Sequence, residues 1–379
     1  MPLKPVDIMM LIAIILCALA VLYPFFIYPM ILRLLPFRPV QRAGPGRVPS
    51  VSLLFCAYNE SAAMPEKIAN LEALKIQHPD LQILAFDDGS SDDTAQQLAA
   101  RPDLLTLVRG DRSGKAHGMK RLAAMATGDV LVFTDANVTL QLDAVANLLA
   151  YYSDQDVGGV LGSLHYVRDE SSATASVGQF YWLIEERLKD LESRSGNVMG
   201  ADGSIFSIRR SLYPSFPDTV LDDLTVSMAV VFAGRRLIKV QDVVAFERLV
   251  SARGDEYRRK VRIAARAWHT HRYLRPQLRR MGWMDRFKYG SRKMVRWFGG
   301  LFLIAGGVLT LGLLWGIYPR VAALCLALVI VGSFVGIRSR SGPFAKVMDI
   351  ILAYIATLQG LLQAMRGRTF AVWNPAKSR

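Results

Sequence analysis

Cysteine and histidine are scarce in this sequence, and their scarcity excludes several kinds of site. The three cysteines, Cys17, Cys56 and Cys325, lie far apart, so a zinc site or a disulfide framework is unsupported. The five histidines form no recognisable ligand set, and no Gly-x-Ser-x-Gly turn indicates a serine hydrolase. We therefore expect any chemistry to rest on other residue types.

Acidic residues are also in the minority, with 32 Asp and Glu against 46 Lys and Arg. Most of the resulting net charge of +14 lies between Arg253 and Arg296, which hold fifteen basic and three acidic residues. No nucleic-acid module accompanies this charge, so no nucleic-acid partner is expected. Trp283, Phe287 and Trp297 alternate with the basic residues, which is typical of an interfacial helix against anionic lipid headgroups.

Hydrophobic residues make up 52% of the chain and gather in four long runs. These runs are Ile8–Ile27, Gly299–Tyr318, Val321–Ile337 and Val347–Met365. The first three are long enough to span a bilayer. The fourth contains Asp349, Gln359 and Gln363, so it either spans the membrane or lies flat in the interface. The pattern predicts a multi-pass membrane protein whose basic middle segment is cytosolic.

The first run has two interpretations. Ala18-Leu19-Ala20 resembles the cleavage site of a signal peptide, but apolar sequence continues beyond it, which favours an uncleaved anchor over residues 1–32. The Pro- and Gly-containing stretch Pro36–Pro49 predicts a linker over residues 33–50. A soluble domain is then expected to begin at Val51.

Strand-like and helix-like segments alternate after Val51. The expected strands are Val51–Phe55, Leu81–Phe86, Leu104–Val108 and Val130–Phe133, and the expected helices between them are Ala62–Leu74, Asp93–Ala100 and Lys115–Ala126. Further helices are expected at Ala144–Tyr152, Ser176–Leu191 and Leu224–Ala233. Repeated βαβ units predict an α/β fold with a mainly parallel sheet.

Three of these strands end in polar clusters that carry acids. The clusters are Ala57-Tyr58-Asn59-Glu60, Asp87-Asp88-Gly89-Ser90 and Thr134-Asp135-Ala136-Asn137. Ligands of open α/β sheets bind at the carboxyl ends of the strands, so we expect one shared site for a metal-bound phosphate compound. Asp135 and Asn137 offer oxygen ligands to Mg²⁺ or Mn²⁺, although Asp-x-Asn is equally common in turns.

Two helix starts carry further candidate groups. The stretch Gly110–Ala116 resembles a phosphate-binding P-loop, but its spacing is one residue short and Ala116 replaces the Ser or Thr, so only Lys115 is expected to meet a phosphate. Of Asp222 and Asp223, one acid suffices to stabilise the helix start, which leaves the other free to act as a general base.

Basic side chains at Arg259, Arg262 and Arg266 share one face of a predicted helix. This face is either solvated or turned toward the acid-tipped strands, where it would neutralise a departing diphosphate.

Taken in order, these clusters resemble the membrane-bound family-2 glycosyltransferases, which include cellulose, chitin and hyaluronan synthases and bacterial exopolysaccharide transferases. The similarity runs from Val51 to about His271 and includes five motifs in the same order. It implies a nucleotide-sugar transferase A-type fold over residues 51–250, interfacial helices over 251–298 and a transmembrane region over 299–379. It also implies a bacterial inner membrane location with a cytosolic catalytic domain.

The resemblance assigns roles to individual residues. The expected donor is a nucleoside-diphosphate sugar, with a UDP-sugar favoured. Its base and ribose would be held by Ala57, Tyr58, Glu60, Asp87 and Asp88. Lys115 and Asp135 would lie near its diphosphate. Asp135 and Asn137 stand at the metal site, where Asn137 replaces an aspartate. Asp202, Gly203 and Ser204 match the acceptor-side loop. Asp223, next to Asp222, matches the catalytic base.

Arg259 and Arg262 fall where processive synthases carry Gln-x-x-Arg-Trp, with Arg259 and Ile263 in place of Gln and Trp. We therefore expect an inverting glycosyltransferase that adds a sugar to a lipid-linked saccharide acceptor in polysaccharide biosynthesis. A processive polysaccharide synthase and a non-catalytic nucleotide-sugar-binding membrane module are the alternatives.

Overall fold

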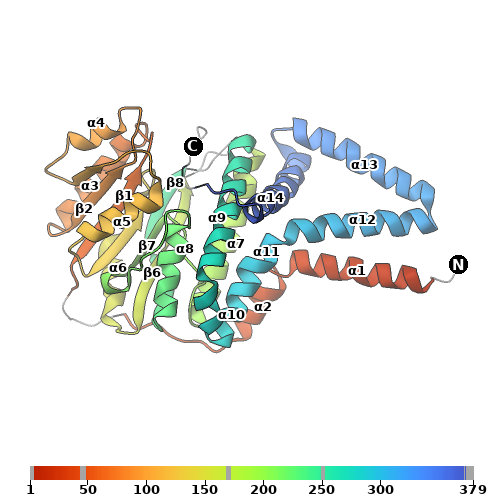
Figure 1. The fold of residues 1–379 in the computed structure, drawn as a ribbon, viewed down its shortest axis with the longest axis horizontal. Coiled ribbons are helices and arrows are strands. Elements are labelled where there is room, and N and C mark those ends of the chain that lie inside the picture. The colour runs from red at the N-terminus through yellow and green to blue at the C-terminus, as the bar shows by residue number, and fades with distance from the viewer. Residues whose placement is uncertain (1–3, 43–47, 168–171, 249–251, 371, 373–379) are drawn as a thin grey trace.

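The computed structural model describes residues 4–42, 48–167, 172–248, 252–370 and 372. The expected linker over 33–50 and the C-terminal region over 299–379 therefore lie partly outside the described residues. A sheet domain, a middle layer of helices and a group of long apolar helices follow one another along the longest axis of the molecule (Figure 1).

In the described part of the chain the sheet has eight strands, in the order β3-β2-β1-β4-β7-β6-β8-β5. They are β1 (Val51–Ala57), β2 (Gln82–Asp87), β3 (Thr106–Arg109), β4 (Val130–Thr134), β5 (Thr139–Leu140), β6 (Val157–Val167), β7 (Ile205–Arg209) and β8 (Arg236–Arg248). The four strands that the sequence predicts pair in parallel, which confirms the α/β class. β7 is antiparallel to both β4 and β6, and this reversal brings the loop before β7 to the carboxyl end of β4.

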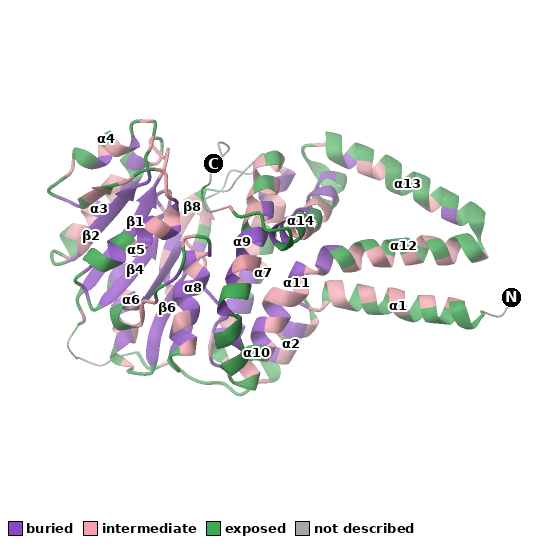
Figure 2. Cartoon of the chain, viewed as in Figure 1, coloured by how far each residue is buried: buried purple, intermediate pink, exposed green. Residues whose placement is uncertain are grey.

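The central strands are largely apolar and buried because helices cover both faces of the sheet. The covering helices are α3 (Met64–Gln77), α4 (Thr94–Ala99), α5 (Lys115–Met125), α6 (Ala144–Ala150) and α8 (Asp222–Phe232). Successive residues of β1 point to opposite faces, so Leu53 packs in the same core as Leu71 of α3, whereas Leu54 packs with Met119 of α5. Figure 2 shows this buried core concentrated in the strands.

The middle layer joins the sheet domain to the apolar helices. It consists of α2 (Ile27–Leu34), α7 (Ala173–Arg194), α9 (Arg253–Arg280), α10 (Trp283–Tyr289), the π-helical segment Gly290–Met294 and α11 (Val295–Trp297). The basic segment of the sequence thus forms helices between the sheet and the long apolar helices (Figure 1).

Within the described residues, four helices are long and apolar enough to cross a membrane. They are α1 (Pro5–Leu22), α12 (Gly299–Ile317), α13 (Pro319–Arg338) and α14 (Gly342–Met365). The first three project together away from the sheet domain, whereas α14 packs against α7 and α9 (Figure 1). Asp349 accepts a hydrogen bond from Thr174 and pairs with Arg253, and Gln359 accepts one from Tyr257. Two of the polar residues that interrupt this apolar run therefore meet protein groups.

Candidate active site

Lys115 lies at the centre of the candidate site. It begins α5, and its Nζ donates to Asp135 Oδ1 at 2.5 Å and lies 3.9 Å from Asp222 Oδ2. Burial alone would lower the pKa of Lys115, but the carboxylates of Asp135, Asp222 and Asp223 raise it above its ordinary value. The ammonium therefore stays charged and holds the acid at the end of β4 close to the acids at the start of α8.

Gly203 brings the expected acceptor-side loop against the same lysine. A Cβ at this position would lie 2.7 Å from Lys115 Nζ and 3.0 Å from Asp135 Oδ2, closer than side-chain atoms pack. The loop also contains Gly200, whose φ of 95° favours glycine. The absence of a side chain at Gly203 is thus what lets the loop approach the two charged groups.

Asp222 and Asp223 form the first turn of α8, after the N-cap residue Leu221. Asp222 is buried, whereas Asp223 is half-buried and accepts a hydrogen bond from the Leu224 backbone N–H at 2.6 Å. Burial, and then the neighbouring carboxylate of Asp222, raise the pKa of Asp223 to about 6. A carboxylate with a raised pKa is better suited to accept a proton near neutral pH than an ordinary aspartate.

Asp135 and Asn137 lie at the tip of β4, where a metal is expected. Among the described residues, no group of three or more His, Cys, Asp or Glu side chains is arranged to hold a metal ion. One carboxylate and one amide nevertheless suit Mg²⁺ or Mn²⁺ when water and a diphosphate complete the coordination. Asn137 Nδ2 donates to Glu247 Oε1 of β8 at 3.0 Å, which leaves its Oδ1 available as a ligand.

Lys67 of α3 binds the backbone of the turn that follows β4. Its fully buried ammonium donates to the backbone oxygens of Val138 at 2.6 Å and Asp135 at 3.1 Å. Burial lowers the pKa of Lys67 to about 7, although Asp135 acts in the opposite direction. This lysine fixes the turn that carries the expected metal ligands.

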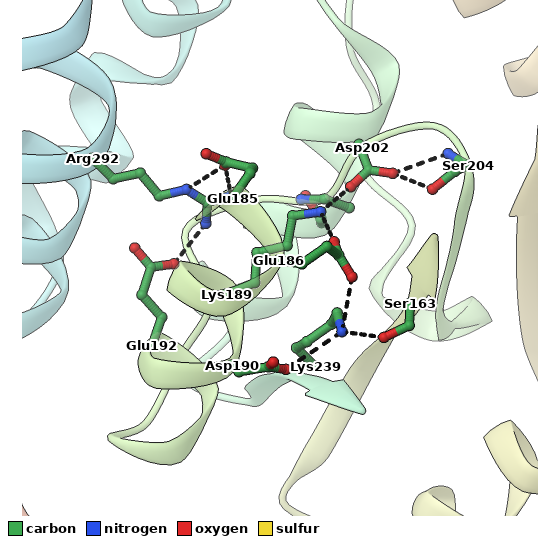
Figure 3. A network of polar contacts seen from close by, with 12 residues as sticks. Ser163, Glu185, Glu186, Lys189, Asp190, Glu192, Asp202, Ser204, Lys239 and Arg292 are labelled. Atoms are coloured by element: carbon green, nitrogen blue, oxygen red, sulfur yellow. Dashed lines mark hydrogen bonds and ion pairs between the residues drawn. The ribbon is translucent and has the colours of Figure 1, made fainter. Parts of the chain in front are cut away.

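Asp202, in the expected acceptor-side loop, forms an ion pair with a buried lysine. Its carboxylate pairs with Lys189 of α7 and accepts a bond from the Ser204 hydroxyl (Figure 3). Burial alone would raise the pKa of Asp202, but Lys189 and Ser204 lower it below its ordinary range. The acid thus holds the acceptor-side loop in place, and Ser204 is part of the same arrangement.

The ends of β1 and β2 lie side by side, as their parallel pairing requires, with Ala57 opposite Asp87. Asp88 is fully buried and accepts bonds from the backbone N–H groups of Ser113 at 2.8 Å and Gly114 at 2.9 Å. It therefore shapes the loop that leads to Lys115.

Neighbouring side chains flank this loop. The Arg112 guanidinium pairs with Asp88 and lies 3.2 Å from the centre of the Tyr58 ring. The backbone N–H of Glu60 donates to Thr94 Oγ1 at 2.9 Å, which ties the end of β1 to α4.

Two of the three arginines on the basic face of α9, Arg259 and Arg266, interact with residues of the site or beside it. Arg259 pairs with Glu256 at 2.8 Å, and although burial alone would lower its pKa, Glu256 and then Tyr166 and Glu247 raise it. Arg262 is half-buried one turn further along the helix. Arg266 is buried, donates to the Val220 carbonyl at 2.6 Å and acts electrostatically on Asp223.

Three residues of the site carry no motif in the sequence. Lys67 of α3 and Glu247 of β8 are far along the chain from the loops that they contact, whereas Lys189 of α7 is 13 residues from Asp202. A lysine at a buried position of a helix is the one signal that could have indicated the two lysines.

Comparison with known proteins places the sheet domain beside a known family. Residues 52–215 match the model of glycosyl transferase family 2. The chain is 24% identical over 238 residues to an N-acetylglucosaminyltransferase from Neorhizobium galegae, covering 58% of this chain and 55% of that protein. It is 24% identical over 196 residues to a poly-beta-1,6-N-acetyl-D-glucosamine synthase from Staphylococcus aureus, covering 49% of this chain and 47% of the relative. The chain thus spans about half the length of the curated relatives it matches.

A solved structure extends the similarity to the whole fold. A mannosyltransferase from Pyrobaculum calidifontis, solved with GDP-Man and Mn²⁺, superimposes with a TM-score of 0.71 at 22% identity. The match covers 95% of this chain and 99% of that one, so it includes the apolar helices as well as the sheet domain. Residues 52–215 therefore match a family-2 glycosyltransferase domain, and the chain has a GT-A-like fold whose sheet domain is joined to helices that are long and apolar enough to cross a membrane.

Proposed function

We propose that this protein transfers a sugar, with inversion, from a nucleoside-diphosphate sugar to a lipid-linked saccharide acceptor at the cytosolic face of the bacterial inner membrane. The observation that carries the proposal is the position of Lys115 between Asp135 and Asp222. One cation thereby lies close to both the expected diphosphate site and the expected catalytic acids, so the donor and the base would be held near each other.

In the proposed reaction, Asp223 accepts the proton of an acceptor hydroxyl while the oxygen attacks the anomeric carbon. The new glycosidic bond forms as the bond from the anomeric carbon to the diphosphate oxygen breaks, and the nucleoside diphosphate leaves. Lys115, Arg259 and Arg262 would neutralise the charge that develops on the leaving group. A Mg²⁺ or Mn²⁺ ion held by Asp135 and Asn137 would contribute to the same neutralisation.

The donor and acceptor are proposed from more general features. Two relatives are named as an N-acetylglucosaminyltransferase and a poly-beta-1,6-N-acetyl-D-glucosamine synthase, and we take these names to favour a UDP-sugar donor. The remaining expected donor contacts, Ala57, Tyr58, Glu60, Asp87 and Asp88, lie on neighbouring strand ends. A lipid-linked acceptor is favoured because the sheet domain joins the apolar helices through the basic helices α9 and α10.

The Asp223→Asn variant tests the catalytic assignment. It should abolish sugar transfer while nucleotide binding stays within about twofold of the wild type, because the amide cannot accept the proton. Asp218→Asn is the matched control, since Asp218 pairs with Lys120 and His117 outside the proposed machinery. Wild-type turnover by Asp223→Asn would disprove the assignment.

A processive polysaccharide synthase is the second candidate, favoured by the poly-N-acetylglucosamine synthase among the relatives. Membranes that contain the protein should be incubated with a panel of labelled nucleotide sugars, with and without a chelator. A lipid-soluble product of a single added sugar supports the proposed function, whereas a long polymer supports the second candidate.

A further inference from the structure

A groove of about 510 Å³ lies between α9 and α10. The residues of α9 that line it recur at helical spacing and are Trp268, His271, Arg272, Arg275, Leu278 and Arg279. The other face of α9 contacts the residues that directly precede Asp222 and Asp223. Arg266 donates to the Val220 carbonyl, and Thr270 accepts from the Leu221 N–H at 2.8 Å. The helix itself therefore separates the groove from Asp222 and Asp223.

The inner part of the groove is aromatic. The rings of Trp268 and His271 stack with centroids 5.6 Å apart, and those of His271 and Tyr289 with centroids 5.8 Å apart. Trp268 also meets Trp297 and Phe298 edge to face, and α12 begins directly after these two residues. An apolar surface thus continues from the groove to the base of a candidate membrane helix.

The rim of the groove is cationic. Arg272, Arg275 and Arg279 of α9 lie along it with Arg286 of α10. Within the part of the chain that the structure describes, these four side chains form no ion pair or hydrogen bond with protein groups. Like charges gathered without acidic partners repel one another, and an anion placed among them relieves that repulsion. Arginine suits phosphate because its planar fork donates two parallel hydrogen bonds.

We propose that this groove binds the phosphate headgroup of an anionic phospholipid of the bilayer, with the apolar part of the lipid directed toward Trp268 and α12. The combination of an aromatic floor, an arginine rim and continuity with a membrane helix fits a lipid better than a soluble anion. This lipid is not a reactant, because α9 stands between it and the catalytic acids.

Native mass spectrometry of the full chain in a neutral detergent tests the proposal. The wild type should retain phosphatidylglycerol in preference to phosphatidylcholine of the same chain length. Arg275→Gln and Arg279→Gln should each weaken this retention about fivefold, whereas Arg280→Gln, on the same helix but outside the groove, should not. Equal retention by Arg279→Gln and Arg280→Gln, or equal retention of the two lipids, would overturn the proposal.

Two further measurements separate this lipid from other ligands. Displacement of phosphatidylglycerol by millimolar inorganic phosphate would assign the groove to a soluble anion and overturn the proposal. A raised acceptor KM in Arg279→Gln, with phosphatidylglycerol retention unchanged, would assign it to the acceptor and also overturn it. Asp223→Asn should retain the lipid as the wild type does. The lipid-binding proposal and the proposed catalytic function are therefore tested independently.

Discussion

Asn137 at the tip of β4 and Glu247 of β8 share a hydrogen bond of 3.0 Å from the amide nitrogen to the carboxylate. The antiparallel pairing of Thr139 with Phe246 brings these two segments together. A carboxylate is therefore present beside the expected metal site even though the second position of the motif is an amide. It orients the amide, and it would repel an aspartate placed there.

The first prediction concerns this pair. Asn137→Asp alone should not strengthen Mn²⁺ binding, because it places two carboxylates about 3 Å apart. The double variant Asn137→Asp with Glu247→Gln should bind Mn²⁺ at least as well as the wild type. Titration of Mn²⁺ in the presence of nucleoside diphosphate, followed by electron paramagnetic resonance, measures both. Additive effects of the two substitutions would contradict a coupling between these side chains.

The second prediction is the pH dependence of transfer. Since the pKa of Asp223 is raised to about 6, the rate should rise with pH through this value and level off above it, where the base is ionised. Asp222→Asn removes the neighbouring charge and should shift the acidic limb to lower pH, whatever its effect on the maximal rate. Rate profiles between pH 4.5 and 8.5 test this expectation, which an unshifted limb would contradict.

The third prediction links the same residue to stability. An aspartate whose pKa is raised on folding stabilises the folded state while it is protonated, and this contribution is lost as pH rises through the folded pKa. At pH 8, Asp223→Asn should therefore unfold at a temperature a few degrees higher than the wild type. The difference should shrink as the pH falls below 6. Differential scanning fluorimetry of Asp223→Asn and Asp218→Asn at both pH values provides the comparison.

The fourth prediction concerns the acceptor-side loop. Lys189→Met leaves Asp202 without its buried cation, whereas Glu186 keeps its ion pair with Lys239, and the loss should cost about 3 kcal/mol of stability. Acceptor KM should rise while nucleotide affinity stays near that of the wild type, because the loop and not the donor site loses its support. Lys189→Arg should restore much of the acceptor affinity, and equal loss of donor and acceptor binding would argue against a positioning role.

The fifth prediction concerns Gly203. Gly203→Ala should lower kcat about tenfold or more, because the new methyl group displaces the Lys115 ammonium from Asp135. Gly282→Ala is the control, since a Cβ there meets no atom within 4 Å. Steady-state kinetics of both variants, with thermal unfolding as a check on folding, distinguish a local displacement from general destabilisation.

The sequence predicts the parallel half of the sheet well and the second half poorly. β1, β2 and β4 are continuous apolar runs, and such runs indicate buried strands. β6 contains Gly158, Gly159 and Gly162, which disfavour a strand prediction. The structure explains Gly159, because a Cβ there would lie 2.7 Å from Leu237 Cδ1 of β8. Close packing between strands therefore obscures the pattern that would reveal one of them.

The residues of the candidate site also fall into two groups, those that a sequence pattern identifies and those that only the structure reveals. Asp135, Lys115 and Asp223 stand at strand ends and helix starts, positions that a linear pattern can identify. Lys189 and Glu247 act through partners that the fold brings to them, and neither has a local pattern that distinguishes it from an ordinary charged residue. Motifs thus predict groups at element ends, whereas supporting contacts require the three-dimensional structure.

Helix α7 carries two sets of charges on one rigid element. Glu185 and Glu192 pair with Arg292, which lies in the π-helical segment between α10 and α11, and Tyr28 of α2 donates to Glu192 at 2.7 Å. Lys189, which lies between these two glutamates on the same helix, pairs with Asp202 of the acceptor-side loop (Figure 3). These contacts therefore fix the distance between the acceptor-side loop and the segments close to α1 and α12 in the chain, which are α2 and the π-helical segment. In the proposed reaction, a lipid-linked sugar chain would reach Asp223 only when its length matches this distance from the apolar helices.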